Sequence, residues 1–278
     1  MPSVFPAMQF TSLQFHFIAA DGRPVRSAVP LHVLRGLFMS AVAAVQPGLA
    51  STIHDAGTLS EFSAQLNVDR ENVFVTYNLF SKRLNEAMRD FILQRDDLRF
   101  NIGRMEALLV KVAVNRIHAG QFIDEAKPIE KAKVVFKTPT FFKSEGAVVL
   151  FPVPEIMFKH LAHSWNELIA EPGTTIDELA LGTWVKEHAR VSAYRLETSS
   201  VDIGDGNRSN TGFKGWATLA IKKDEAGGGF PAVMDRLLRF AEYCNVGGGR
   251  NTGLGAIRYS MLGFQRQPPQ GTILPTTP

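Results

Sequence analysis

The chain has 278 residues, of which 45% are hydrophobic and 21% charged, and its formal net charge at pH 7 is only +3. Its single cysteine, Cys244, excludes an internal disulfide and cannot by itself form a zinc site. No apolar run approaches the ~18 residues that a membrane span needs, and the N-terminus lacks a signal-peptide pattern, so we expect a cytoplasmic protein with no membrane partner.

The first 118 residues predict one ferredoxin-like domain. Residues 8–18 alternate polar and apolar side chains, which is the period of a half-buried strand. Residues 30–45 place apolar side chains at helical spacing, with Pro30 at the start and Pro47 beyond the end, which predicts a helix. Further strands are predicted at 62–66, 72–79 and 105–117, and a second helix at 83–93. The order is β-α-β-β-α-β.

The second half predicts the same order after a polar, proline-bearing break at 124–128. The expected elements are strands or a hairpin at 133–136 and 147–151, a helix at 154–169, strands at 191–198 and 213–221, a helix at 232–243 that ends near Cys244, and a strand at 254–259. We therefore predict an α+β fold of two tandem ferredoxin-like (RRM-like) domains side by side, at 1–126 and 127–264. The tail at 265–278 is expected to be disordered.

A glycine-rich loop at 245–258 joins the last predicted helix to the last strand. Successive glycine amides can turn toward an anion, and Arg250 and Arg258 add positive charge, so the loop is a candidate phosphate-binding site. Equally, the glycines could simply end the helix and relax a tight turn. No Gly-Lys-Ser/Thr follows, and the loop comes after a helix, which argues against the common nucleotide-binding loops.

The loop and three upstream segments carry a resemblance to a known family. The segment Arg236–Tyr243, followed by Val246-Gly247 and Gly253-Leu254-Gly255, resembles the C-terminal signature of the CRISPR repeat-processing endoribonucleases, the Cas-six family of RAMP proteins. Tyr194–Thr198 with Gly212–Trp216, and Phe151–Pro154 with Phe158 and Trp165, resemble that family's preceding segments. Together with Leu49–Asp55, the resemblance extends from the first helix to Arg258.

His54 is the main catalytic candidate that the resemblance implies. By sequence alone, a histidine after a short segment at 47–53 is accessible and is more often a surface residue than a catalyst. The family carries its processing histidine at this step, and histidine can take or give a proton near neutral pH. Cleavage without a metal needs a base for the 2′-hydroxyl and an acid for the leaving 5′-oxygen.

The chain departs from the family pattern beside this histidine. Several members have a tyrosine fifteen residues earlier and a lysine about six residues later, where this chain has Met39 and Ser60. Neither can supply the missing proton transfer or cation. His32 and Arg35 share a helical face with Met39, so either could assist, although they could also simply solvate the helix start. In the loop, Asn245 replaces a glycine of the family pattern and tolerates positive φ.

Other histidines and tryptophans carry weaker signals. His160 and His163 are spaced i, i+3 on a predicted helix, but no carboxylate or thiol pattern completes a metal motif, and we expect no metal or other cofactor. Trp165 is expected in the core. The resemblance places the strand entry before Trp216 near RNA, which directs attention to Phe213 and Lys214.

Taken together, the resemblance implies a metal-independent endoribonuclease that cuts CRISPR repeat RNA once per repeat. The products would be a 5′-hydroxyl and a 2′,3′-cyclic phosphate or 3′-phosphate. Subunits of a CRISPR effector complex and a second copy of the chain remain open as further partners. The candidate RNA-binding residues are Arg208, Lys214, Gly247, Gly248, Gly249, Arg250, Asn251, Gly253, Gly255 and Arg258.

Two other classes of function stay open. The missing tyrosine and lysine also suit a non-catalytic RNA-binding subunit of a CRISPR effector complex. A ferredoxin-like protein that binds a nucleotide or metabolite at the glycine loop would instead ignore RNA. A cleavage assay with repeat RNA distinguishes an endoribonuclease from the non-catalytic subunit. Saturation by a small ligand, without RNA binding, would identify the nucleotide- or metabolite-binding protein.

Overall fold

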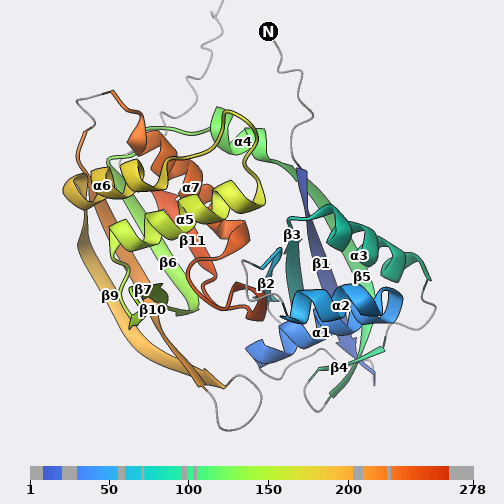
Figure 1. Cartoon of the computed structure of the whole chain (residues 1–278). Coiled ribbons are helices and arrows are strands. Elements are labelled where there is room, and N and C mark those ends of the chain that lie inside the picture. The colour runs from blue at the N-terminus through green and yellow to red at the C-terminus, as the bar shows by residue number, and fades with distance from the viewer. Residues whose placement is uncertain are drawn as a thin grey trace, which may run out of the picture.

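A computed structural model describes residues 9–20, 30–55, 60–69, 72–94, 99–102, 105–202, 209–223 and 227–262, with the backbone alone at 54–55, 68–69 and 72–73. Two antiparallel sheets lie side by side, each with helices packed on one face (Figure 1). Arg208 and the tail at 265–278 lie outside the described residues. Among the described residues, no helix has the length and apolar character needed to cross a membrane.

The N-terminal half forms a five-stranded sheet in the order β2-β3-β1-β5-β4. Its first and third strands, β1 and β3, are adjacent in the middle, as the ferredoxin-like plan requires. The strands are β1 (Gln9–Ala19), β2 (Phe62–Asp69), β3 (Asn72–Leu79), β4 (Arg99–Ile102) and β5 (Met105–His118), and the helices are α1 (Leu31–Val45), α2 (Pro47–Asp55) and α3 (Lys82–Gln94).

The C-terminal half forms a four-stranded sheet in the order β11-β6-β10-β9, which is the same plan. A two-stranded hairpin, β7–β8, is inserted after its first strand. The strands are β6 (Lys131–Thr140), β7 (Phe142–Ser144), β8 (Ala147–Val149), β9 (Ala189–Asp202), β10 (Ser209–Ile221) and β11 (Ile257–Met261). The helices are α4 (Ala119–Asp124), which precedes the sheet, α5 (Pro154–Leu168), α6 (Glu178–His188), α7 (Phe230–Cys244) and the short η1 (Arg250–Thr252).

The predicted elements are found, and the described part of the chain contains further ones. The sequence does not predict helices α2, α4 and α6, the short helix η1, or strands β4 and β7. Strand β8 ends at Val149, two residues earlier than predicted. The last strand was predicted from Leu254 but begins at Ile257, because Gly255 adopts φ +70° and the Leu254 amide donates to the carbonyl of Gly249 at 3.1 Å. These contacts fold residues 253–255 into a turn.

Each half has its own hydrophobic core, and aromatic rings join the two. Phe10 of β1 belongs to the C-terminal cluster, with its ring centroid 5.4 Å from that of Tyr243 and 6.3 Å from that of Phe122. Trp165 is fully buried, as predicted, and Cys244 is buried at the end of α7. The domain interface is therefore packed with apolar side chains.

Candidate nucleic-acid interface

The first turn of α1 lies beside the end of β9, so it brings the two halves together (Figure 1). Nδ1 of His32 is 3.4 Å from the carbonyl oxygen of Asp202. Arg35 follows one turn later and is half-buried. Met39, on the same helical face, packs against the N-terminal core. His32 and Arg35 therefore occupy the boundary between the domains.

His54 lies in the last turn of α2 rather than in a loop. The sequence reading treated 47–53 as a short irregular connection, and this is wrong. Gln46 leaves helical geometry at φ −141°, and Pro47 then begins a second helix, a position where its fixed φ and missing N–H are favourable. The catalytic role of His54 remains a prediction.

Ser60, at the position of the family's lysine, is engaged locally. Its hydroxyl donates to the carbonyl of Phe62 at 2.9 Å, at the start of β2. Ser60 thus secures the entry to a strand, and Met39 fills space at the core.

The glycine loop, predicted at 245–258, covers residues 245–256 in the structure, because β11 begins at Ile257. It is built on close backbone contacts. A Cβ at Gly247 would lie 2.1 Å from the carbonyl oxygen of Phe141, and one at Gly255 would lie 1.8 Å from that of Val246. Both residues also have positive φ, +71° and +70°. Only glycine fits at such positions. Close backbone packing and positive φ therefore require glycine at these two positions, independently of any phosphate binding.

Some of the loop amides are already used inside the protein. The amide of Gly248 donates to Phe141 at 3.0 Å, and that of Gly255 donates to Pro139 at 3.1 Å. The amide of Gly253 points to the carbonyl of Arg250 at 3.4 Å. The amides that find no acceptor in the described part of the chain are those of Gly247, Gly249, Arg250 and Asn251. Any phosphate bound by the loop would meet these amides.

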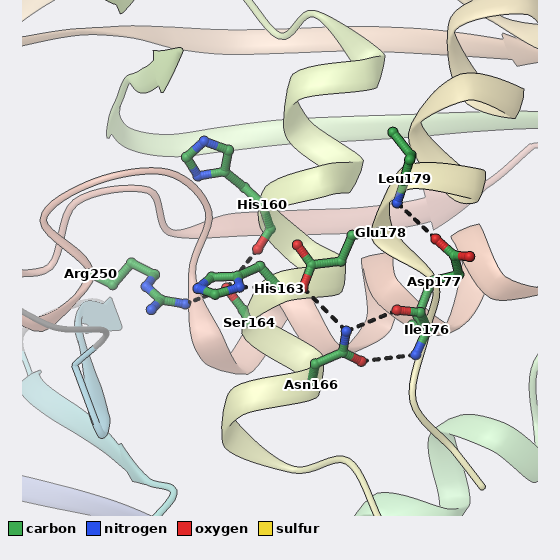
Figure 2. Close-up of polar contacts among 9 residues, drawn as sticks. All are labelled: His160, His163, Ser164, Asn166, Ile176, Asp177, Glu178, Leu179 and Arg250. Carbon is green, nitrogen blue, oxygen red and sulfur yellow. Dashed lines mark hydrogen bonds and ion pairs between the residues drawn. The ribbon is translucent and has the colours of Figure 1, made fainter. Parts of the chain in front are cut away.

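Arg250 points into the protein in this structure. Figure 2 shows its guanidinium at Ser164 of α5, to which Nη1 donates at 2.8 Å. The residue is only 7% exposed. Burial lowers the pKa of the guanidinium, which still stays charged at neutral pH. Arg250 therefore ties the glycine loop to α5, and a contact with RNA phosphate would require this side chain to turn outward.

The sequence predicts that Arg250 binds an RNA phosphate, which requires its side chain to turn outward. On that prediction, Arg250→Ala should weaken RNA binding and reduce the slope of log affinity against log salt by about one, because one phosphate contact is lost. Ser164→Ala is the matched control, since it removes the protein partner and keeps the charge. Filter binding over a salt series measures both. A lower melting temperature with unchanged affinity and slope would assign Arg250 a purely structural role.

Three polar side chains of α5, those of His160, His163 and Asn166, bind neighbouring segments. Nε2 of His160 is 3.0 Å from the carbonyl of Lys143. Nδ1 of His163 is 3.3 Å from Oε1 of Glu178 (Figure 2). Burial lowers the pKa of His160. Asn166 both donates to and accepts from the backbone of Ile176 at 2.9 Å. In the ranges that the structure describes, no group of three or more His, Cys, Asp or Glu is arranged to hold a metal.

The helix-free face of the C-terminal sheet is basic. Lys214 and Trp216 alternate on β10 with the buried Phe213 and Ala217, so they point away from the core. Nζ of Lys133 lies 4.9 Å from the centroid of the Trp216 ring. Phe213, which the sequence reading placed near RNA, is 2% exposed and packs on Phe136 instead. Lys214 is therefore the accessible member of that pair.

Two further cations extend this face toward the N-terminal sheet. Arg258 of β11 is exposed, and Nζ of Lys137 of β6 lies 3.5 Å from Oδ1 of Asn67 on β2. Partial burial, and to a smaller extent the charge of Arg258, lower the pKa of Lys137. The sequence reading missed Lys137 and Lys133, although lysines at 131, 133 and 137 share one face of an alternating strand.

The other basic residues of the last third are largely engaged. Arg239 forms ion pairs with Asp235 at 2.9 Å and Glu125 at 3.3 Å. The guanidinium of Arg236 stacks over the Trp165 ring at 4.7 Å. These two arginines stabilise α7 rather than a nucleic-acid surface.

Comparison with known proteins finds one family model and several sequence relatives, each of which matches part of this chain. The family model described as CRISPR-associated endoribonuclease Cas6 matches residues 134–257. A CRISPR-associated endoribonuclease Cas6 of Streptococcus thermophilus is 31% identical over 125 residues, covering 45% of this chain and 49% of that protein. One of Mycobacterium tuberculosis is 29% identical over 190 residues, covering 64% of this chain and 57% of that protein. The chain thus spans about half the length of the curated relatives it matches. The resemblance read from the sequence is confirmed.

Solved structures extend the likeness to nearly the whole fold. A Cas6 product complex has a TM-score of 0.74 at 20% identity, covering 91% of this chain and 100% of that chain. A structure of Thermus thermophilus Cas6 has a TM-score of 0.70 at 20% identity, covering 92% and 100%. At this identity the likeness shows the fold, and the predicted tandem ferredoxin-like architecture is confirmed.

Proposed function

We propose that this chain belongs to the Cas6 family of RAMP proteins and is an endoribonuclease that binds CRISPR repeat RNA and cuts it within each repeat. The observation that carries the proposal is the match of residues 134–257, which includes the glycine loop, to the family of CRISPR-associated endoribonucleases. The loop lies against the domain that contains His54, because a Cβ at Gly253 would approach Cδ1 of Leu34 on α1 to 2.7 Å.

The chemistry that we propose is an internal transesterification. A base removes the proton of a 2′-hydroxyl, whose oxygen attacks the adjacent phosphorus while the bond from phosphorus to the 5′-oxygen breaks. An acid protonates that leaving 5′-oxygen. The products are a 2′,3′-cyclic phosphate, which can hydrolyse to a 3′-phosphate, and a 5′-hydroxyl. This reaction needs proton transfer and stabilisation of the charge on phosphorus. The RNA supplies the nucleophile, and in this proposal protein side chains supply the rest.

In this proposal His54 performs the main proton transfer. His32 and Arg35 lie at the domain boundary, where the first turn of α1 meets β9, and they are the available second proton carrier and cation. Lys214, Arg258 and the free loop amides bind backbone phosphates, and Arg208 would add a further charge. Lys133 and Lys137 extend this basic surface, which suits the phosphate contacts that dominate RNA affinity.

Cleavage of repeat RNA in the presence of EDTA tests the proposal. We expect one cut per repeat at a rate unchanged by EDTA, because the nucleophile is the substrate's own 2′-hydroxyl. End-labelled repeat RNA on a denaturing gel measures this, with an RNA of scrambled sequence as control. A rate that collapses in EDTA and recovers with Mg²⁺ would overturn metal independence, and small-ligand binding without RNA binding would overturn the function.

A non-catalytic RNA-binding subunit of a CRISPR effector complex is the second candidate. The observation that favours it is that Met39 packs against the core and Ser60 is bonded to Phe62, so neither replaces the family's tyrosine or lysine. Tight binding of repeat RNA without any cut would select this candidate. Sedimentation of the RNA complex would then show whether a second copy takes part.

A further inference from the structure

Four polar side chains form a latch between the two domains, which we define as Ser63 and Gln65 of β2, Asn78 of β3, and Asn245 at the end of α7. Asn245 is completely buried and adopts φ +61°. Gln65 and Asn245 meet directly, since Nε2 of Gln65 donates to Oδ1 of Asn245 at 2.8 Å. The latch therefore joins the edge strand of the N-terminal sheet to the C-terminal domain.

In one direction, the N-terminal domain caps α7. The last carbonyls of a helix have no partner within the helix. Here the carbonyl of Glu242 accepts from Gln65 at 2.7 Å, and that of Tyr243 accepts from Asn78 at 2.8 Å and from the Ser63 hydroxyl. The end of α7, from which the glycine loop departs, is thus held by side chains of the other domain.

In the other direction, Asn245 binds both the N-terminal domain and the glycine loop. Its Nδ2 donates to the carbonyl of Ala64 on β2 at 3.0 Å. The same group donates to Leu254 at 3.0 Å and lies 3.2 Å from the carbonyl of Arg250, so it spans both ends of η1. One buried amide therefore sets the position of the loop relative to β2.

The elements that contact the loop also flank α2 in the chain. On one side, Leu34 of α1 packs at Gly253, and on the other, β2 supplies Ala64 and Gln65. Helix α2, with His54 in its last turn, connects these two elements. A shift of the loop against α1 and β2 would therefore change the distance between a loop-bound phosphate and His54.

We propose that Asn245 is a positioning residue. Through the latch it fixes the position of the glycine loop relative to the domain that contains His54. The inference rests on the proposed function. A glycine would satisfy the positive φ but make none of these hydrogen bonds. An aspartate would keep the shape but set a carboxylate against three carbonyl oxygens.

Two variants and a matched control test this role. Because small misplacements of reacting groups have large kinetic effects, we expect Asn245→Asp to lower the single-turnover cleavage rate about tenfold or more. Asn245→Gly should have a smaller effect. The affinity for a 2′-deoxy repeat RNA should change less than about threefold in both variants. Asn85→Ala on α3 removes an amide that donates to the carbonyl of Ser81 one helix turn earlier, and it should leave the rate unchanged.

A distance measurement separates positioning from activity. Spin labels at Lys82→Cys and Leu179→Cys, both highly exposed, report on the two domains. Burial raises the pKa of the Cys244 thiol to about 12, so it should not react with the label. We expect a narrow distribution of distances between the two labels when residue 245 is asparagine, and a broader distribution in the Asn245→Asp and Asn245→Gly variants. An unchanged distribution together with an unchanged rate, in protein shown to be folded, would overturn the proposal. If the wild type never cuts repeat RNA, the proposed function falls, and the distances alone still decide whether the latch holds the domains.

Discussion

His54→Ala is expected to lower the single-turnover cleavage rate of repeat RNA by about 10²–10⁴-fold, the usual contribution of a general acid or base. Repeat-RNA affinity should change little, because the imidazole is proposed to move protons rather than to hold the backbone. With Met39 packed at the core and Ser60 bonded to Phe62, no neighbour at the family's other positions can share this role. His32→Ala should therefore have a much smaller effect.

The comparison requires folded proteins, since His54 follows the buried Ile53 in α2 and a destabilised variant would also lose binding. Circular dichroism and thermal melting of each variant provide this control, and His54→Gln offers a second, polar replacement. A folded His54→Ala protein that cuts at the wild-type rate would remove His54 from the mechanism.

Replacing the 2′-hydroxyl at the cut site by hydrogen is expected to abolish cleavage while leaving binding intact. The deoxy linkage keeps its phosphate, so contacts with Lys214, Arg258 and the loop amides are preserved, but the attacking oxygen is gone. Gel-shift and cleavage assays on the same RNA measure the two properties. As a control, a deoxy substitution one nucleotide away should be cut normally.

Normal cutting of the deoxy substrate at the same linkage would mean that water or another group is the nucleophile. In that case the products would lack a cyclic phosphate. The role of His54 would then have to be reconsidered as activation of water.

The ferredoxin-like plan could be predicted because its main elements are long and periodic. The strand at 8–18 and the helices at 30–45 and 232–243 repeat apolar side chains with periods of two and 3.6, and these periods depend on local geometry alone. Helix α6 was missed because its apolar side chains do not keep to one face: Leu179 is exposed while Leu181 is buried. Helices α2, α4 and η1 and strands β4 and β7 were missed because they are short. A few residues carry too little periodicity to distinguish a helix or strand from a connection.

The glycine loop was found from its composition, but the cause of its glycines was not. The sequence shows five glycines between 247 and 255. Only the folded chain shows that Gly247 lies against the carbonyl of Phe141, a residue more than a hundred positions away. Likewise, Arg250 looks like a free cation in the sequence, and only the folded chain shows that it is buried and donates to Ser164 of α5.

The sequence by itself determined the family resemblance, the order of elements and the candidate residues, because these are properties of single residues and of short-range spacing. The tertiary structure decided which of those residues are exposed and which bind one another. Asn245 and the carbonyl of Ala64, 181 positions apart, illustrate the reason. A hydrogen bond depends on position in space, and local periodicity contains no information about a partner so distant in the chain.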